Sequence, residues 1–219
     1  MHVVVNAAMS ADGKLSSRRR EQIRISGADD FDRVDRLRAE SDAVMVGVGT
    51  VLADDPSLTV DETDLLGDDA ANGPVRVVAD SRARTPADAR ILDDTATTYL
   101  LVSEAAPADR IETLADRGAK VVTAGETQTD LTAALDALEA AEIERLMIEG
   151  GGELIYSLFA ADLVDELSVF VGPTVIGGRD APTLADGEGF VEQFPSLRLA
   201  DVERLDGGVL LRWDATGKQ

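Results

Sequence analysis

Short β-branched runs alternate with helix-patterned stretches along most of this chain, and this alternation limits the fold more than any other feature. Residues 3–5 and 43–46 are uninterrupted apolar runs, typical of strands buried on both faces. Between them Phe31, Val34 and Leu37 fall at helical spacing. Strands joined through helices run parallel and are covered on both faces. The sequence therefore predicts an α/β fold with a mostly parallel central sheet.

The same alternation continues and then changes near the C-terminus. Further strands are expected at residues 75–78, 98–102, 120–122 and 145–148, and helices at residues 109–117, 130–141 and 154–163. A strand at residues 167–171 follows, and then residues 197–205 and 208–213 flank Asp206-Gly207, a hairpin signal. We expect one domain over residues 1–219 with a mixed sheet and a C-terminal antiparallel hairpin. The acidic, glycine-bearing stretch at residues 61–73 is the expected insert.

The charge balance excludes several kinds of partner. The chain has 42 Asp and Glu against 21 Lys and Arg, a net charge of −21, which argues against nucleic acid and membrane partners. The lysines are Lys14, Lys120 and Lys218. Such an acidic, lysine-poor chain is typical of a halophilic protein, whose self-repulsion salt screens, although an ordinary acidic protein has the same sign of charge.

Residue types that are absent exclude further chemistry. There is no cysteine, and the single histidine, His2, is expected to be a surface residue. Thiolate catalysis, histidine triads and Cys/His zinc sites are therefore excluded, and no metal is expected. Because no targeting segment and no membrane-length apolar run is visible, we expect a cytoplasmic protein.

The segment from Glu149 to Glu153 is a candidate phosphate cradle. Gly150, Gly151 and Gly152 join the apolar run at residues 145–148 to the predicted helix at residues 154–163. Glycines at a helix N-terminus leave backbone N–H groups accessible where the helix dipole favours an anion such as a dinucleotide pyrophosphate. A tight turn that needs positive φ explains the same glycines. The spacing matches neither the Rossmann fingerprint nor a Walker loop.

Four stretches in this order carry a resemblance to a known family. They are NAAMSADGKL at residues 6–15, RAESDAVMVGVGTVLADDPSLTV at residues 38–60, RVVADSR at residues 76–82 and EGGGEL at residues 149–154, the last continuing to Gly172-Pro173. The chain resembles, over nearly its whole length, the reductases of riboflavin biosynthesis, both the stand-alone archaeal form and the C-terminal domain of bacterial bifunctional deaminase-reductases. No deaminase part is present.

The resemblance implies a dihydrofolate-reductase-like fold, a homodimer, and hydride transfer from NADPH, or NADH, to a pyrimidine ribosylamine 5′-phosphate. In the archaeal form that substrate is 2,5-diamino-6-ribosylamino-4(3H)-pyrimidinone 5′-phosphate. Lys14 and Glu149 match catalytic positions, and the substrate-side positions match Arg38, Leu58 and Glu149. The cofactor-binding positions match Ala8, Thr50, Asp54, Asp80, Ser81, Gly150, Gly151, Gly152 and Glu153.

Each of these residues also has an ordinary structural explanation. A lysine after Asp-Gly is often a solvated turn residue, Thr50 and Ser81 are equally compatible with helix caps, and Arg38 with a surface ion pair. Two other functions also remain: another reductase on this fold, such as a dihydrofolate reductase, and a non-catalytic nucleotide-binding homologue. The residue that selects NADPH over NADH cannot be placed from the sequence, with Arg82 and Arg84 as candidates.

We predict that folding depends on salt. A charge of −21 on 219 residues repels itself once screening is removed. Circular dichroism should show loss of structure when potassium chloride is dialysed from molar to low millimolar concentration. An unchanged melting temperature over that range would contradict the halophilic interpretation.

Overall fold

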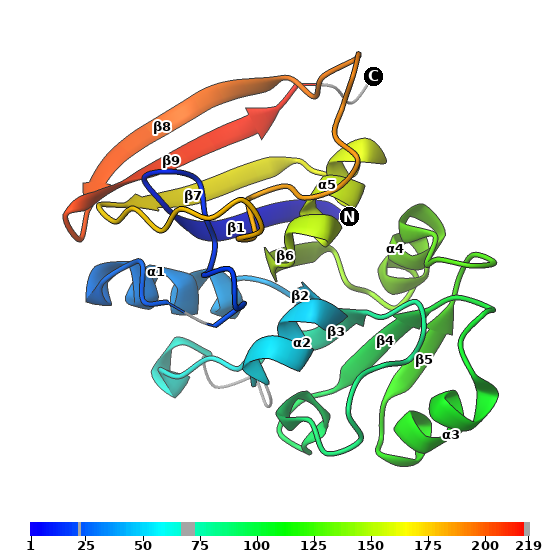
Figure 1. The fold of residues 1–219 in the computed structure, drawn as a ribbon. Coiled ribbons are helices and arrows are strands. Elements are labelled where there is room, and N and C mark those ends of the chain that lie inside the picture. The colour runs from blue at the N-terminus through cyan, green and yellow to red at the C-terminus, as the bar shows by residue number, and fades with distance from the viewer. Residues whose placement is uncertain (22, 67–72, 217–219) are drawn as a thin grey trace. The chain divides into compact units, whose positions relative to one another are not determined.

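The computed structural model describes residues 1–21, 23–66 and 73–216 and is drawn in Figure 1. The predicted insert at residues 61–73 therefore lies partly outside the described residues. The packing divides into two compact units, one of Met1 with residues 35–147 and one of residues 2–34 with residues 148–219.

The first unit is built on parallel strands. Its strand order is β5-β4-β3-β2 followed by the start of β6, and the pairs β2–β3, β3–β4 and β4–β5 are parallel. The strands are β2 (Ala43–Gly47), β3 (Val75–Ala79), β4 (Thr98–Val102), β5 (Lys120–Thr123) and β6 (Arg145–Gly150). Helices α2 (Val48–Asp54), α3 (Ala108–Asp116) and α4 (Leu131–Glu139) and the 3-10 turns η1 (Thr63–Leu66) and η2 (Arg90–Leu92) connect them. Leu114 of α3 and Leu138 of α4 are fully buried.

The second unit combines parallel and antiparallel pairing. Its strand order is the end of β6, then β1-β7-β9-β8. Strand β1 is parallel to β7, and the pairs β7–β9 and β9–β8 are antiparallel. The strands are β1 (His2–Ser10), β7 (Glu166–Gly172), β8 (Leu197–Leu205) and β9 (Gly208–Ala215). Helices are α1 (Ala28–Ala39), whose last residues belong to the first unit, and α5 (Gly152–Ala160). The predicted mixed sheet with a C-terminal hairpin is confirmed, and its two strands are the long orange and red arrows in Figure 1.

Helix α1 packs on the sheet of the second unit through a buried polar cluster. Arg33 donates to Asn6 Oδ1 of β1 at 2.8 Å and to Ser168 Oγ of β7 at 3.3 Å, and it pairs with the buried Asp30 at 2.7 Å. Asn6 and Ser168 are partners in register, so they point to the same face. Beside them Ile25, Phe170 and Leu210 form an apolar cluster. This face of the sheet is therefore the one that α1 covers.

The hairpin turn caps α1 from a distance of more than 170 residues along the chain. The Asp206 carboxylate accepts hydrogen bonds from the backbone N–H groups of Gly27, Asp29 and Asp30 at 3.1, 3.3 and 2.8 Å. These are the donors that the first turn of a helix leaves without intrahelical partners. Asp206 has a φ of 49°, a conformation that Asp and Asn tolerate better than most side chains. The C-terminal hairpin thereby holds the start of α1.

We predict that Asp206→Ala lowers the free energy of unfolding by about 1–2 kcal/mol, the cost of losing a helix N-cap. Urea unfolding followed by circular dichroism at molar potassium chloride measures the change. Asp206→Asn should lose less, because its amide oxygen still accepts. Equal stability of Asp206→Ala and wild type would contradict the capping role.

Candidate active site

The turn after β1 fixes the backbone of Lys14. The buried Ser10 hydroxyl donates to Asp12 Oδ1 at 2.6 Å and accepts from the Lys14 N–H at 2.9 Å. The Ser10 N–H in turn donates to the Lys14 carbonyl at 2.9 Å. Gly13 has a φ of 79°, which a glycine adopts without strain. The Asp-Gly-Lys sequence thus forms a closed turn with the lysine side chain half-buried at its end.

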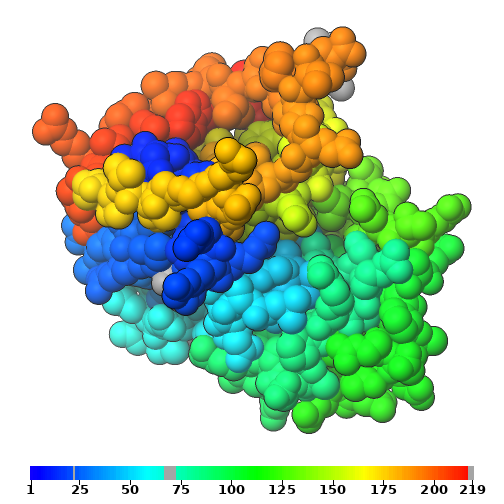
Figure 2. Space-filling view, in the orientation of Figure 1, coloured from blue at the N-terminus to red at the C-terminus, as the bar shows by residue number. Residues whose placement is uncertain are grey.

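The segment of residues 174–186 is attached to this turn. The Asp12 carboxylate accepts from the N–H groups of Ile176 and Gly177 at 3.0 and 2.7 Å. The Lys14 ammonium donates to the Ala181 carbonyl at 3.2 Å. Figure 2 shows the segment in gold on the surface beside the dark blue N-terminal turn. The hydrogen bond from the Ser10 hydroxyl, followed by that from Ile176, lowers the pKa of Asp12 from 3.8 to about 2. Asp12 therefore stays ionised at neutral pH.

The three glycines at the start of α5 are required for two different reasons. Gly150 and Gly151 have φ values of 146° and 96°, which side chains rarely adopt. A Cβ on Gly152 would lie 2.5 Å from the Thr183 carbonyl oxygen and 2.7 Å from Asp186 Oδ2. The Asp186 N–H also donates to the Gly152 carbonyl at 3.0 Å. The turn explanation holds for Gly150 and Gly151, and Gly152 is small because the 174–186 segment packs against it.

Thr183 brings the Lys14 turn and the glycine turn together. Its backbone forms an antiparallel bridge with Lys14, and its carbonyl lies against Gly152. The segment is fixed there because the Thr183 N–H donates to both oxygens of Asp186 at 3.2 and 3.1 Å. Lys14 and the start of α5 are therefore neighbours within one unit, although 138 positions separate Lys14 from Gly152.

The start of α5 has the donors that an anion needs. The first intrahelical bond runs from the Ile155 N–H to the Gly151 carbonyl at 2.9 Å, so the preceding N–H groups have no partner within the helix. Glu153 is exposed in this first turn, where a carboxylate complements the helix dipole itself. A phosphate here would have to approach on the side away from that carboxylate.

Two more predicted residues lie in this unit. Glu149 is half-buried at the end of β6, immediately before the glycine turn. Ala8 is on β1 and packs against the cluster of Ile25, Phe170 and Leu210. The methyl group of Ala8 is thus part of the core, and a contact with a cofactor would have to use what remains exposed of this half-buried residue.

The first unit contains a strained segment after α2. Thr50 and Asp54 are on α2, a helix that the sequence did not predict. Asp55 and Leu58 have φ values of 42° and 53°, a conformation that costs a non-glycine residue about 1–3 kcal/mol and is common at functional sites. Arg38 of α1 donates to the carbonyl of Thr59, the residue after Leu58, at 2.8 Å. The predicted substrate-side residues Arg38 and Leu58 are therefore close together. On α2, partial burial raises the pKa of Asp54.

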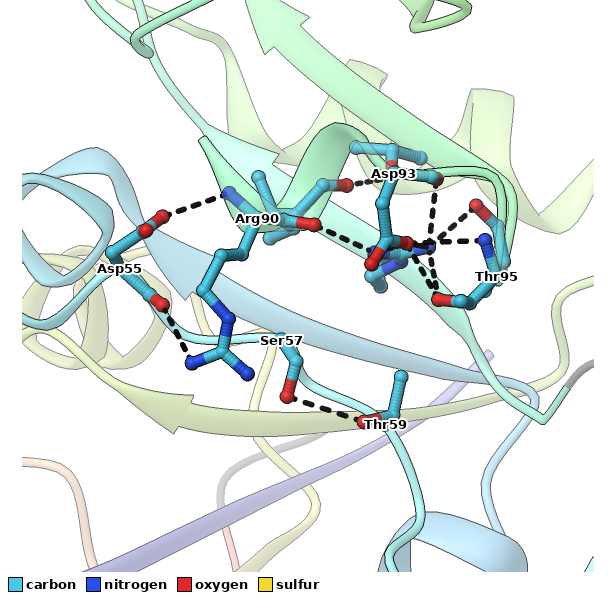
Figure 3. A network of polar contacts seen from close by, with 10 residues as sticks. Asp55, Ser57, Thr59, Arg90, Asp93 and Thr95 are labelled. Atoms are coloured by element: carbon cyan, nitrogen blue, oxygen red, sulfur yellow. Dashed lines mark hydrogen bonds and ion pairs between the residues drawn. The ribbon is translucent and has the colours of Figure 1, made fainter. Parts of the chain in front are cut away.

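A polar network supports the strained segment (Figure 3). The Arg90 N–H donates to Asp55 Oδ1 at 2.9 Å. Arg76 of β3 is fully buried and donates to Asp93 Oδ1 at 2.8 and 2.9 Å and to the Arg90 carbonyl at 3.3 Å. Burial of Asp93 opposes its ionisation, but hydrogen bonds from Thr95 and Arg76 outweigh it and lower the pKa of Asp93. The buried guanidinium thereby fixes the loop that holds Asp55.

Asp80 and Ser81 are mainly engaged within the protein. Asp80 is fully buried, and its Oδ2 accepts from the Thr85 N–H and hydroxyl at 2.7 and 2.8 Å. The Ser81 hydroxyl accepts from the Thr129 N–H at 2.9 Å and lies 3.1 Å from the Thr129 hydroxyl. Since that hydroxyl donates to the Leu101 carbonyl, Ser81 is the donor of this pair. Neither Ser81 nor Thr50 is a helix cap, because Gly47 caps α2 and Asp130 caps α4.

Other features of the described residues do not coincide with these positions. A hollow of about 470 Å³ lies where β4 and β5 begin, and none of the predicted site residues lines it. Within residues 1–21, 23–66 and 73–216, no three His, Asp or Glu side chains are grouped as ligands for a metal ion. In the same residues no helix is long and apolar enough to cross a membrane.

Comparison with known sequences decides the family. The model of the RibD C-terminal domain matches residues 1–211. The chain belongs to this family. It is 48% identical over 211 residues to the 2,5-diamino-6-ribosylamino-4(3H)-pyrimidinone 5′-phosphate reductase of Archaeoglobus fulgidus, covering 94% of each chain. It is 50% identical over 198 residues to the protein of the same name from Methanothermobacter thermautotrophicus, covering 90% of this chain and 89% of that one.

Solved structures of this family share the fold. Acinetobacter baumannii RibD superimposes with a TM-score of 0.80 at 29% identity, over 98% of this chain and 58% of that chain. The Saccharomyces riboflavin biosynthesis reductase Rib7 superimposes with a TM-score of 0.73 at 19% identity, over 98% of this chain and 90% of that chain. The fold expected from the resemblance is thus confirmed.

The structure adds residues that the sequence patterns did not point to. Asp12 was visible only as part of the Asp-Gly-Lys turn, and nothing in the sequence joined it to Ile176 and Gly177. Thr183 and Asp186 lie in a stretch without strand or helix periodicity. Arg76 lies within a predicted buried strand. A charged side chain is unusual there, and this exception is the signal by which the sequence could have pointed to Arg76.

We predict that Gly152→Ala lowers the free energy of unfolding by about 1–3 kcal/mol, since the added methyl group must displace backbone of the 174–186 segment. Gly49→Ala is the matched control, because Gly49 is also in the first turn of a helix but nothing lies within 4 Å of its added Cβ. The control should be neutral or stabilising. Chemical unfolding of both variants measures the difference, and equal effects would contradict the packing explanation.

Proposed function

We propose that this protein reduces the ribosyl group of 2,5-diamino-6-ribosylamino-4(3H)-pyrimidinone 5′-phosphate to ribityl, in riboflavin biosynthesis, with a nicotinamide cofactor. Two archaeal relatives that are named as the reductase of this compound are about half identical to this protein over nearly their whole length. The observation in the structure that carries the proposal is the contact of Thr183 with both Lys14 and Gly152. It supports a site with a cation and an anion-binding helix start side by side.

The residues of the second unit fit the cofactor's pyrophosphate. Gly150 and Gly151 give a turn without side chains, and the nine-residue helix α5 follows with its first N–H groups outside the intrahelical ladder. We propose Gly150, Gly151, Gly152 and Glu153 for this role, with a contact from Ala8. From the first unit we propose Thr50, Asp54, Asp80 and Ser81 as further contacts of the cofactor.

We further propose that the cofactor is NADPH. Arg82 and Arg84 are exposed immediately after Ser81, where β3 ends. Arg84 Nε lies 3.9 Å from the buried Asp80 Oδ1, a long contact, and the Arg84 side chain is 60% exposed, so most of its donors face solvent. Two guanidinium groups beside one turn suit the 2′-phosphate, which NADH lacks.

The chemistry assigns separate roles to Lys14 and Glu149. A cyclic ribosylamine must open to an imine before its C1′ can accept hydride, and this requires a proton at the ring oxygen. The nicotinamide, when bound, supplies the hydride. The Lys14 ammonium is a donor for the ring oxygen or for the substrate phosphate. Glu149 orients the pyrimidine or accepts a proton, and Arg38 and Leu58 contact the substrate.

We also propose a homodimer that works in a salt-rich cytoplasm. Strand β8 is the last strand of its sheet, and Leu199 and Val202 are 52% and 54% exposed. Their register partners on β9, Trp213 and Leu211, lie on the same face and are only half-buried. A second copy is the partner proposed for this apolar face.

We predict that Lys14→Met and Glu149→Gln each lower kcat/KM by roughly 10²–10⁴-fold, since proton transfer and orientation are lost. The dissociation constant for NADPH should stay near wild type, because neither side chain belongs to the proposed cofactor contacts. NADPH oxidation at 340 nm and cofactor titration by fluorescence measure the two quantities. Wild-type turnover in both variants would remove these residues from the active site.

A further inference from the structure

Asp12 is joined to Lys14 by two independent routes. The local route is the Ser10 hydroxyl, which donates to Asp12 and accepts from the Lys14 N–H, so one buried side chain touches both residues. The second route runs through the 174–186 segment. Asp12 accepts from Ile176 and Gly177, and the Lys14 ammonium donates to Ala181 four residues further on.

The second route is short and closed. The Ala181 N–H donates to the Gly178 carbonyl at 3.4 Å, which folds residues 178–181 into a turn directly after the two N–H groups that Asp12 holds. The Leu15 N–H then donates to the Pro182 carbonyl at 2.9 Å. Ala181 is 3% exposed, so the carbonyl that receives the ammonium belongs to a packed residue. The contacts of Asp12 therefore help to fix where this acceptor lies, together with the backbone bonds that join Ala11 and Leu15 to the same segment.

This arrangement fixes the long Lys14 side chain by placing its acceptor, the Ala181 carbonyl, in advance. Fixing a lysine side chain costs rotamer entropy that a single hydrogen bond to a carbonyl only roughly offsets. Lys14 is thus held only if its acceptor is already in place. An ionised carboxylate that accepts three hydrogen bonds is a strong anchor for that acceptor.

We propose that Asp12 is a positioning residue for Lys14, which it sets through the Ser10 hydroxyl and through the backbone of Ile176 and Gly177. Asp12 itself takes no part in the chemistry. Its effect on turnover rests on the proposed function of Lys14, whereas its effect on the place of the ammonium does not.

Lysine labelling tests the placement without any activity. With few lysines in the chain, acetylation of Lys14 can be followed by mass spectrometry against the exposed Lys120 as an internal reference. Asp12→Asn should raise the ratio of the Lys14 rate to the Lys120 rate at least about threefold, as the ammonium leaves its acceptor. Ser10→Ala, which keeps the contact with Ile176 and Gly177, should raise it less. An unchanged ratio in Asp12→Asn would overturn the inference.

Asp206→Asn is the matched control. It also alters a carboxylate that accepts backbone N–H groups of a distant segment, but those of Gly27, Asp29 and Asp30. It should lower the melting temperature and leave the labelling ratio unchanged. A ratio that rises equally in Asp206→Asn would show that general loosening exposes Lys14, and would also overturn the inference.

A double-mutant cycle tests the consequence for turnover. Asp12→Asn should lower kcat/KM by about tenfold in the wild-type background and by less than about twofold in Lys14→Met, because the positioned group is already gone. The dissociation constant for NADPH should not move. Equal losses in both backgrounds would show that Asp12 acts independently of Lys14. If the wild type fails to oxidise NADPH with the substrate, the proposed function is wrong, and the labelling result still decides on Asp12.

Discussion

The attachment of the 174–186 segment to the turn after β1 is the constraint on which the second unit of this structure depends. Residues 174–186 contain no strand or helix, so their place is set by the partners they bind. Asp12 holds one part of the segment, and the other part lies against Gly152 through Thr183 and Asp186. Lys14 and the start of α5 are brought together by this one segment, and this pairing of a lysine with a helix N-terminus is the structural basis of the proposed function.

The fold was largely predictable, because parallel strands that are buried on both faces consist of uninterrupted apolar runs. Each expected strand was found. Helix α2 was missed since Gly49, Thr50 and Val51 are poor helix formers, and tertiary packing of Val48 and Val51 decides their conformation. Asp206-Gly207 was recognised as a hairpin turn from its own residues. Its role as the cap of α1 depends on a contact that no local pattern encodes.

The contacts that hold the candidate site residues could not be predicted from the sequence. The sequence allows either a phosphate cradle or a tight turn for the three glycines at the start of α5. In the structure Gly150 and Gly151 form a turn with positive φ, and Gly152 packs against Thr183 and Asp186. Lys14 was found through the resemblance, whereas the ring of contacts that holds it spans more than 160 positions of sequence. The resemblance matches Leu58 to a substrate-side position, but its strained φ is visible only in the backbone of the structure.

Hydride transfer to C1′ of a pyrimidine ribosylamine phosphate is the step on which the proposed function depends. It can be followed with NADPH that carries deuterium at both hydrogen positions of C4 of the nicotinamide, with 2,5-diamino-6-ribosylamino-4(3H)-pyrimidinone 5′-phosphate and the wild-type protein in molar potassium chloride. We expect a ribityl product that carries a single deuterium at C1′, seen by mass spectrometry and NMR. Cofactor oxidation without deuterium in the product, or no ribityl product at all, would contradict the proposed function.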